Sequence, residues 1–467
     1  MTSPTVLWFR RDLRLSDHRA LLEASRHSGV VGLYVLDPVL LAGCGPSRAH
    51  YLAHTLTALN DSMGGALVVR AGDSAEVVAE VCREVGATRV YVTEDFAPYG
   101  RSRDERVRDH LATLGVELLG MDTPYAVRPG TVRTQAGTPP KVFTPFFRGW
   151  EATSPPPPLD EEVSPEWVTL DSLEVDTIFR YAGTRRPDLF GDLPDPTAST
   201  FADVGEAGAQ RQLEQFLTRL ESYGEARNTP GEESTSRLSP HLRFGTIHPR
   251  QVLAATRGTS KSAGVFRSEV AWREFYGDVL FHQPQSVWRA LQPAMEHLRV
   301  DDGEEARSRF RAWARGETGY PLVDAGMRQL LAEGWMHNRV RMVCASFLVK
   351  HLHLDWRWGA RWFLWCLIDA DVASNQHGWQ WTAGTGTDAA PFHRVFNPTL
   401  QAERFDPEGR YVRRYVTPLA ETPAPQCLQP GGGGGLLAPA GYVSPLIDAA
   451  RERDEALVRF AEVKAYR

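Results

Sequence analysis

A helical segment in the middle of the chain combines four side chains of complementary chemistry. In the run SEVAWREFY, positions i, i+3, i+4 and i+7 of one helix face hold Glu269, Trp272, Arg273 and Tyr276. A core stripe would not contain a carboxylate and a guanidinium at its centre, and an exposed stripe rarely contains tryptophan. The pattern therefore predicts a pocket wall that stacks on a flat heterocycle and hydrogen-bonds it.

Hydroxyl groups gather upstream of this helix, in the run YGEARNTPGEESTSRLS. They belong to Tyr223, Ser234, Thr235, Ser236 and Ser239. Hydroxyls and backbone amides at the start of a helix suit an anionic phosphate. The alternative is an ordinary helix N-cap, which such a run forms more often.

Two later runs add amide, guanidinium and carboxylate groups. In GWMHNRVRM, Asn338 and Arg341 share one helix face, and Arg339 shares another with Met342. In LIDADVASNQHGWQW, two carboxylates suit ribose hydroxyls or a guanidinium, and an amide suits the edge of a heteroaromatic ring. These three side chains are Asp369, Asp371 and Asn375. Each alone has an alternative as a cap, turn or core residue, but their joint occurrence favours a nucleotide-like site.

The elements that must position these groups change character along the chain. Residues 1–130 alternate short apolar runs with amphipathic stretches, which predicts a parallel α/β sheet, Rossmann-like, with helices on both faces. The expected strands are Thr5–Phe9, Val30–Leu36, Ala66–Arg70, Arg89–Thr93 and Val116–Leu119. Neither GxGxxG nor GxxxxGK[ST] occurs, so an ordinary dinucleotide or P-loop site is disfavoured.

The rest of the chain divides into a linker and a helical domain. Residues 131–207 include the proline-rich and acidic runs SPPPPLDEEVSPEW and GDLPDP, which predict an extended linker. Residues 208–467 show helical periodicity almost throughout, so an all-α domain is expected, with a final helix at Pro445–Val463 after a loop at Gly431–Gly435.

Composition limits the class of protein. The 467 residues contain five scattered cysteines without CxxC, which fits the cytoplasm and argues against a disulfide framework or a zinc ribbon. We expect neither a signal peptide nor a membrane span, because the apolar run at the start is short and is followed by arginine, and no later apolar run is long enough. The net charge of −6 hides a segment, residues 151–233, with 18 acidic and 6 basic side chains. The part after it is mildly basic, so an anionic partner is compatible with the sequence.

These motifs together resemble the DNA photolyase/cryptochrome family. The resemblance is carried by VLWFRRDLRLSDHRAL, TSRLSPHLRFG, WREFY, TGYPLVDAGMRQL, GWMHNRVRM, ASFLVKHL, LIDADVASNQHGWQW and FNP, and it runs from Thr5 to about Phe460. Within the family the chain is most similar to class I cyclobutane pyrimidine dimer (deoxyribodipyrimidine) photolyases. The resemblance implies an antenna domain followed by a domain that binds FAD.

The resemblance also assigns roles to residues. The expected FAD contacts are Tyr223, Thr235, Ser236, Arg237, Leu238, Ser239, Asn338, Arg341, Asp369, Asp371 and Asn375. The expected contacts to UV-damaged DNA are Arg227, Glu269, Trp272, Arg273, Arg339, Met342, Trp381 and Arg394. The implied mechanism is light-driven: excited FADH⁻ donates an electron to a flipped-out dimer, Glu269 stabilises the dimer radical anion, the ring opens and the electron returns.

One departure from the family concerns electron transfer to the flavin. Three tryptophans usually relay this electron, and Trp379 and Trp356 match the inner two. The outer position falls near Asp301–Gly303, where the chain reads VDDGEE and has no tryptophan. We expect a shortened or rerouted relay, for which Trp358, Trp362 and Trp365 are candidates; packing is the alternative role for these three.

The second chromophore and the activity leave alternatives open. DFAPYGRSRD resembles members that bind 8-hydroxy-5-deazaflavin, more than those that bind folate, with Asp95, Arg103 and Arg243 as contacts; capping and salt bridges are the alternative. Other activities are a cryptochrome-type photoreceptor and a (6-4) photoproduct photolyase. Asn375 and the stretch WMHNRVRM favour cyclobutane repair. We expect no metal site, because His351/His353 and Asp369/Asp371 lack further ligands at suitable spacing. We also expect the protein to be a monomer.

Overall fold

The computed structural model describes residues 3–27, 29–161, 163–258, 260–388, 394–433 and 441–466. Its N-terminal part contains five parallel strands in the order β3-β2-β1-β4-β5. The strands are β1 (Thr5–Phe9), β2 (Val30–Leu36), β3 (Val68–Ala71), β4 (Arg89–Thr93) and β5 (Glu117–Asp122). The predicted α/β class is thus confirmed, although β3 and β5 extend further toward their carboxyl ends than the sequence indicates.

Helices cover both faces of the sheet, as continuous apolar strands require. They are α1 (Arg19–Ala24), α2 (Pro38–Ala42), α3 (Pro46–Ser62), α4 (Ser74–Val85) and α5 (Pro98–Ala112). Val6 and Trp8 of β1 pack in a cluster with α4 and α5, whereas Leu7 and Phe9 pack in a cluster with α1 and α3. Successive residues of a strand point to opposite faces, so β1 contributes to two cores at once.

The loop after β1 docks on the helical part of the chain. In a dinucleotide-binding fold this loop would be rich in glycine, but here it contains Arg11, Arg14 and Asp17. Arg14 donates a 3.1 Å hydrogen bond to the carbonyl oxygen of Gly245, and Arg250 donates to the Asp17 carboxylate at 2.7 Å. Gly245 has a φ of +69°, and a Cβ there would lie 1.9 Å from the Arg11 carbonyl oxygen. This loop is therefore a junction between the two parts of the chain.

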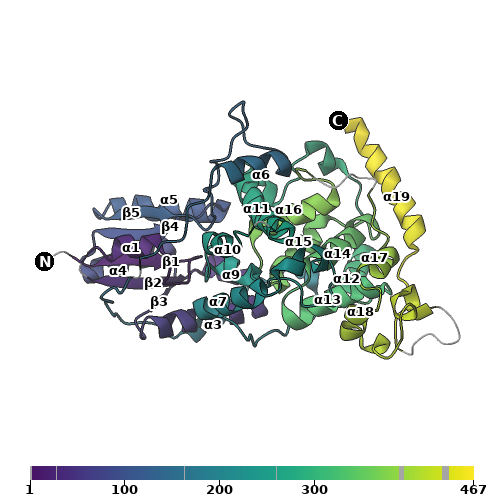
Figure 1. Ribbon diagram of the computed structural model, residues 1–467, viewed down its shortest axis with the longest axis horizontal. Helices are drawn as coiled ribbons and strands as arrows, with labels where there is room; N and C mark the ends of the chain where they lie inside the picture. Colours follow the sequence, from purple (N-terminus) through teal and green to yellow (C-terminus); the bar gives the residue numbers. More distant parts are fainter. Residues whose placement is uncertain are drawn as a thin grey trace.

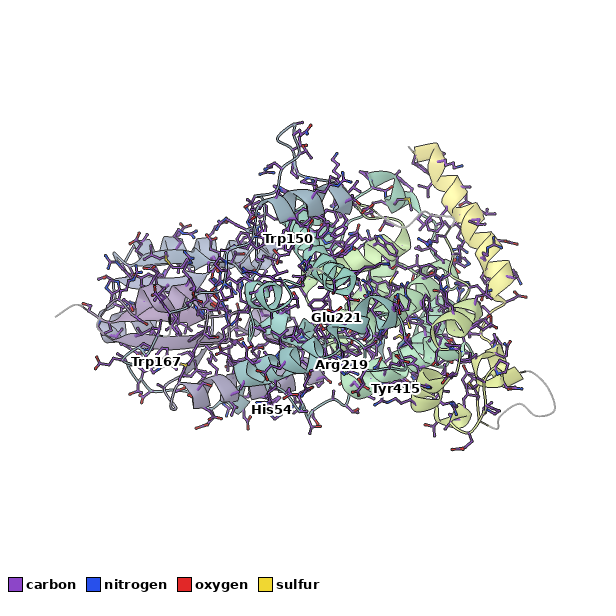
Figure 2. The ribbon with its side chains drawn as sticks, viewed as in Figure 1. His54, Trp150, Trp167, Arg219, Glu221 and Tyr415 are labelled. Carbon is purple, nitrogen blue, oxygen red and sulfur yellow. The ribbon has the colours of Figure 1, made fainter. Side chains whose placement is uncertain are left out.

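The segment that follows β5 is less extended than predicted. It contains the helix α6 (Phe143–Ala152), where an extended linker was expected. Beyond α6, Trp167 forms an isolated parallel bridge with Val30 and lies beside the sheet (Figure 2). The proline-rich run therefore follows the surface of the sheet before the chain enters the helical part.

The remaining described residues form the helical part, which contains no further strand in those ranges. Its helices are α7 (Gly205–Leu217), α8 (Tyr223–Ala226), α9 (Ser239–Phe244), α10 (Pro249–Ala255), α11 (Lys261–His282), α12 (Glu304–Arg315), α13 (Pro321–Glu333), α14 (Asn338–Lys350), α15 (Trp356–Cys366), α16 (Val372–Ala383), α17 (Pro398–Phe405), α18 (Arg410–Tyr415) and α19 (Ala449–Glu462). Figure 1 shows the sheet at one end of the molecule and α19 at the other. The largest buried cluster joins α12 to α16.

Two expectations for the C-terminal region meet the structure differently. The final helix begins at Ala449, a few residues later than the predicted Pro445. The glycine tract lies partly outside the described residues, and its first part forms a short 3-10 turn, Pro430–Gly433. Within the described ranges, every helix is too short or too polar to cross a membrane.

Candidate active site

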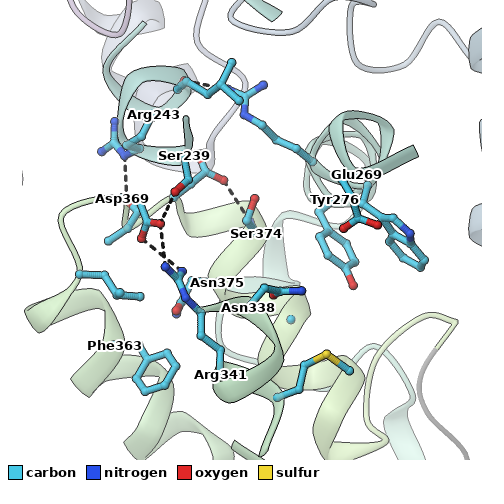
Figure 3. Close-up of a pocket in the computed structure, with 18 of the residues that line it drawn as sticks. Ser239, Arg243, Glu269, Tyr276, Asn338, Arg341, Phe363, Asp369, Ser374 and Asn375 are labelled. Carbon is cyan, nitrogen blue, oxygen red and sulfur yellow. Dashed lines mark hydrogen bonds and ion pairs between the residues drawn. The ribbon is translucent and has the colours of Figure 1, made fainter. Parts of the chain in front are cut away.

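One cavity of about 510 Å³ in the helical part gathers most of the predicted site residues (Figure 3). This volume is in the usual range for small-molecule sites. Of the expected cofactor contacts, the cavity is lined by Tyr223, Ser236, Leu238, Ser239, Asn338, Arg341, Asp369, Asp371 and Asn375. Of the expected substrate contacts, it is lined by Arg227, Glu269, Trp272, Arg273, Arg339, Met342 and Trp381.

The Asp369 carboxylate is held by two side chains at the cavity wall, through three hydrogen bonds. Arg341 donates to both of its oxygens, at 3.2 and 2.8 Å, and the Ser239 hydroxyl donates to Oδ2 at 2.7 Å. Arg341 is itself fixed by a 2.8 Å hydrogen bond to the carbonyl oxygen of Met336. Figure 3 shows these partners converging from α9, α14 and the segment before α16. A bidentate ion pair of this kind fixes orientation as well as charge.

Asp371 is the N-cap of α16 and receives a guanidinium from the α/β part of the chain. Its carboxylate accepts a hydrogen bond from the Ser374 amide at 3.0 Å and from Arg11 at 2.5 Å. Burial opposes ionisation, but Arg11, Arg273 and Arg243 nearby hold the pKa of Asp371 below its usual value. The carboxylate therefore remains charged in the wall of the cavity.

The predicted antenna residues are divided by the structure. Arg243 lines the main cavity and donates to the carbonyl oxygen of Ala370 at 2.7 Å. Burial, together with the like charge of Arg11, lowers the pKa of Arg243 to about 10. Asp95 and Arg103 lie instead at the carboxyl ends of the strands, 3.5 Å from each other, and both side chains are largely buried. These two residues lie outside the cavity lining, although the Asp95 charge still acts on Arg243.

Asn375 presents an amide to the cavity from the first turn of α16. Its Nδ2 atom donates to the carbonyl oxygen of Ala360 at 3.1 Å and to Gln376 Oε1 at 2.7 Å. Its Oδ1 atom has no hydrogen-bond partner among the described residues. Gly378, one turn later, also lines the cavity, and a Cβ there would meet no atom within 4 Å. This side of α16 therefore leaves room, and a hydrogen-bonding group, for a bound molecule.

The outer wall of the cavity is the predicted face of α11. Arg227 donates to Glu269 Oε1 at 2.6 Å. Trp272 stacks on Phe143 of α6, with ring centroids 3.8 Å apart and planes 7° from parallel. Arg273 is placed differently from expectation: it donates to the carbonyl oxygens of Pro124 and Leu242, at 3.0 and 3.1 Å, so its donors are engaged with backbone inside the protein.

Guanidiniums gather at the Arg339 side of the cavity. Burial and the like charges of Arg227, Arg404 and Arg394 lower the pKa of Arg339. Arg339 also donates to Asn228 Oδ1 at 2.8 Å and lies 4.6 Å from the centroid of the Phe405 ring. Four neighbouring cations favour an anionic partner. Arg404 was missed because an isolated arginine at the end of a short helix carries no sequence signal.

Besides Asp95 and Arg103, four of the predicted site residues lie outside the cavity lining. Thr235 lies half-buried in the segment before α9, and the exposed Arg394 lies beyond the lining. Arg237 donates to Glu333 at 3.0 Å. Trp356 is buried at the start of α15. Of the run 235–239, in which phosphate contacts were expected, only Ser236, Leu238 and Ser239 thus line the cavity, without Thr235 and Arg237.

Trp379 lies between the cavity and the core. Its Nε1 atom is buried without a hydrogen-bond partner among the described residues. A Cβ at Gly359 would lie 2.1 Å from its ring, so glycine at this position allows the two helices to approach. The nearby rings of Phe363 and Trp313 have centroids 5.0 and 6.1 Å away. Trp379 is thus in contact with an aromatic core as well as with the cavity.

An ion-paired carboxylate stands where the outer tryptophan of the relay was expected. Asp301 accepts hydrogen bonds from Arg309 at 2.8 Å and from Arg459 at 2.6 Å. It thereby connects α12 to α19. In the described part of the chain, no group of three metal-ligating side chains is placed to hold a metal ion.

The chemistry of this cavity fits a cofactor with both polar and flat aromatic parts. Carboxylates and hydroxyls lie at one wall, and Phe363, Trp379 and Leu238 provide apolar surface. The unpartnered Asn375 Oδ1 offers such a molecule an acceptor, and the open space beside Gly378 offers it room. The residues present therefore fit FAD.

Comparison with known proteins agrees with this geometry. The protein-family model described as DNA photolyase matches residues 5–165. The family model described as the FAD binding domain of DNA photolyase matches residues 266–462. A curated deoxyribodipyrimidine photo-lyase of Agrobacterium fabrum is 38% identical, over 99% of this chain and 98% of its own length.

Solved structures extend the likeness. A class III photolyase from Agrobacterium tumefaciens has a TM-score of 0.89 at 37% identity, covering 100% of this chain and 98% of that one. A cryptochrome from Synechocystis has a TM-score of 0.84 at 28% identity, covering 98% and 99%. The first of these is described as class III, whereas the sequence motifs favour class I. The class I assignment therefore stays a prediction, and the solved neighbours support the family rather than the class.

Proposed function

The chain belongs to the DNA photolyase family, and we propose that it repairs cyclobutane pyrimidine dimers in DNA under blue light. The observation that carries this proposal is the meeting of two sets of residues in one cavity. The Asp369–Arg341 pair and Asn375 line its inner wall, and the α11 face with Glu269 and Trp272 forms its outer wall. A lesion in the outer part would thus lie next to a cofactor in the inner part.

Reduced FAD is the proposed cofactor, and when bound it supplies an electron to the lesion on absorbing blue light and takes it back after ring opening. We assign its contacts to Tyr223, Ser236, Leu238, Ser239, Asn338, Arg341, Asp369, Asp371 and Asn375. The Ser236–Ser239 run is suited to bind the phosphates of the cofactor. The carboxylates of Asp369 and Asp371 are suited to accept hydrogen bonds from its hydroxyl and imino groups. Thr235 and Arg237 would support this run from behind.

The substrate side of the cavity is proposed to hold the dimer after it leaves the duplex. Flipping a nucleotide costs a few kcal/mol, less for a damaged pair. Stacking on Trp272 and Trp381 recovers roughly 1–3 kcal/mol per base, and Met342 lines the pocket. Glu269 would hydrogen-bond the damaged bases and stabilise the charge that develops on them.

Arg227 is proposed to change its partner when DNA binds. In the structure its guanidinium pairs with Glu269 at 2.6 Å. A phosphate of the DNA backbone would compete for the guanidinium, which would free the carboxylate to face the bases. Arg339, Arg394 and Arg404 add positive charge beside it, so binding is expected to depend strongly on salt.

Three further assignments complete the proposal. The second chromophore is proposed to be 8-hydroxy-5-deazaflavin, and the sequence DFAPYGRSRD after β4 supports it. The five cysteines are free and buried, which supports a reducing cytoplasm. We propose that the protein acts as a monomer.

The direct test is a repair assay with a duplex that contains one thymine dimer. After flavin reduction, blue light should restore the two thymines, and a dark control should leave the dimer intact. A duplex with one (6-4) photoproduct should remain unrepaired. Repair of the (6-4) lesion alone would reassign the substrate, and flavin photochemistry without any repair would favour a photoreceptor.

A further inference from the structure

We propose that Phe143, at the start of α6, is a positioning residue that holds Trp272 and the end of α16 at a fixed separation. This inference rests on the proposed function, because it concerns the slot in which the lesion would stack. It assigns a role in lesion recognition to a helix that lies outside the cavity lining.

The first observation is the stack itself. The Phe143 and Trp272 rings are 3.8 Å apart between centroids and only 7° from parallel. Phe147 extends the stack behind Phe143, with centroids 5.6 Å apart and planes 15° from parallel. Because Phe143 covers one face of the indole, Trp272 can offer only its other face to a base.

The second observation concerns the backbone of the same residue. The Phe143 amide donates to Asp388 Oδ2 at 3.0 Å, and the Thr387 hydroxyl donates to the carbonyl oxygen of Lys141. Phe143 begins a helix of 10 residues whose N-cap, Val142, has no side-chain hydrogen bond. Asp388 therefore supplies an acceptor and a negative charge that this helix end lacks.

These two contacts connect the two walls of the slot. Thr387 and Asp388 lie in the turn directly after α16, the helix that carries Trp381. Trp272 is on α11. Phe143 thus contacts the first wall through its ring and the second through its amide. Phe143, Thr387 and Asp388 themselves lie outside the cavity lining, so they act on the slot from behind its walls.

A fixed separation has a physical consequence for binding. An indole that is already held parallel to its neighbour loses little conformational freedom when a base stacks on it. Aromatic pairs of this geometry contribute more than their buried area alone. Loss of the ring should weaken binding to the lesion, whereas contacts to the undamaged backbone should be unaffected.

The test compares Phe143→Leu with the matched control Phe147→Leu, both as flavin-loaded full-length protein. Dissociation constants are measured for a thymine-dimer duplex and for the same duplex undamaged. Phe143→Leu should weaken binding to the lesion duplex about two- to tenfold and leave binding to the undamaged duplex unchanged. Repair per absorbed photon at saturating DNA should be unchanged, and Phe147→Leu should behave as wild type.

Two results would overturn the inference. One is equal lesion preference in Phe143→Leu and wild type. The other is an equal loss of affinity for both duplexes together with a loss of bound flavin, which indicates general disruption. If Phe143→Leu does not fold, Asp388→Ala decides: a smaller lesion preference supports the connection, and an unchanged one refutes it. A wild-type protein that does not prefer the dimer at all would instead refute the proposed function.

Discussion

The guanidinium of Arg11 lies 2.5 Å from a carboxylate oxygen of Asp371, a residue 360 positions further along the chain. Arg11 follows β1, and Asp371 caps α16 in the wall of the cavity. The α/β part of the chain thus contributes a charge to the cofactor site. Arg11 also lies 4.0 Å from Asp95, so the same guanidinium connects the strand ends with the cavity.

Replacement of Arg11 by methionine should destabilise the protein and its cofactor site. Asp371 would keep Arg243 and Arg273 nearby but lose its direct partner. Breaking a buried pair by removal of one partner costs about 3–5 kcal/mol, and the partial exposure of Arg11 favours the lower end. Urea denaturation and flavin release measure the effect. Arg26→Met, which removes a surface pair with Glu23, should change neither; equal effects of both variants would contradict this role.

Replacement of Glu269 by glutamine should separate binding from repair. The amide can still hydrogen-bond a base but carries no charge and pairs weakly with Arg227. We expect affinity for undamaged DNA to be unchanged and repair per absorbed photon to fall about tenfold, since an oriented group that meets developing charge is worth about that much or more. Quantum yield at saturating lesion DNA is the measurement. Glu214→Gln on the exposed side of α7 is the control, and a normal yield in E269Q would remove Glu269 from the chemistry.

The sequence predicts β1, β2 and β4 with their observed bounds because each is a short apolar run buried on both faces. The α11 face is predicted for a related reason, since helical spacing alone places Glu269 and Trp272 side by side. Such features depend on neighbours in the chain. They are therefore visible before any tertiary contact is known.

The features that escaped prediction depend on distant contacts. Arg11 has its partner 360 positions away, and Phe143 belongs to a helix in a stretch assigned to a linker. Arg273 was expected to meet phosphate, but its donors are engaged by the carbonyl oxygens of Pro124 and Leu242. A guanidinium on a helix face has the same sequence pattern in both roles. Only the packing of the chain decides between them.

Replacement of Arg404 by alanine should reduce the salt dependence of DNA binding. Arg404 lies close enough to Arg339 to lower its pKa, so it belongs to the same group of cations. Each phosphate contact contributes about −0.9 to the slope of log affinity against log salt. The slope should therefore become about 1 less steep, for damaged and undamaged duplexes alike. Arg83→Ala, on α4 at the opposite end of the molecule (Figure 1), should leave the slope unchanged. A wild-type slope in R404A would show that Arg404 does not contact the DNA.

Buried histidines should make the protein sensitive to mild acid. Burial lowers the pKa of His241, His337, His351 and His377 to about 4. In the unfolded chain they titrate near 6.5, so below that pH the unfolded state binds more protons. The contribution of these histidines to the free energy of unfolding is therefore fully present above about pH 6.5. Between there and about pH 4, the free energy of unfolding falls by about 1.4 kcal/mol per pH unit for each histidine.

His351 offers a clean test of this pH dependence. Its Nδ1 atom is buried without a partner among the described residues, and its ring stacks on Phe347. His351→Leu should flatten the dependence of unfolding free energy on pH by about 1.4 kcal/mol per unit between pH 6.5 and 4. Urea denaturation at several pH values measures the slope. The exposed His54→Gln should keep the wild-type slope, and a wild-type slope in H351L would contradict the assignment.

Photoreduction of the flavin should depend on Trp358. Asp301 lies where the outer tryptophan of the relay was expected. It forms ion pairs with Arg309 and Arg459, and a tryptophan there would break both pairs. An alternative series of ring contacts leads outward from the cavity. The Trp379 and Trp313 ring centroids are 6.1 Å apart, and Phe310 lies between Trp313 and Trp358, 5.8 and 5.7 Å from their centroids. The charge would pass between these two indoles through Phe310 without resting on it. Trp358 is only half-buried, so it is the member of the series nearest to solvent.

Trp358→Phe should therefore slow photoreduction of oxidised flavin while light-driven repair by reduced enzyme stays intact. The reason is that a phenylalanine cannot hold the oxidised charge that an indole holds, whereas repair needs no external electron. Transient absorption of the tryptophan radical measures the first effect, and the dimer assay measures the second. Trp167→Phe, beside the sheet, is the control. A fast, long-lived radical of unchanged yield in W358F would eliminate this route, and the relay would then end at Trp356 or Trp313.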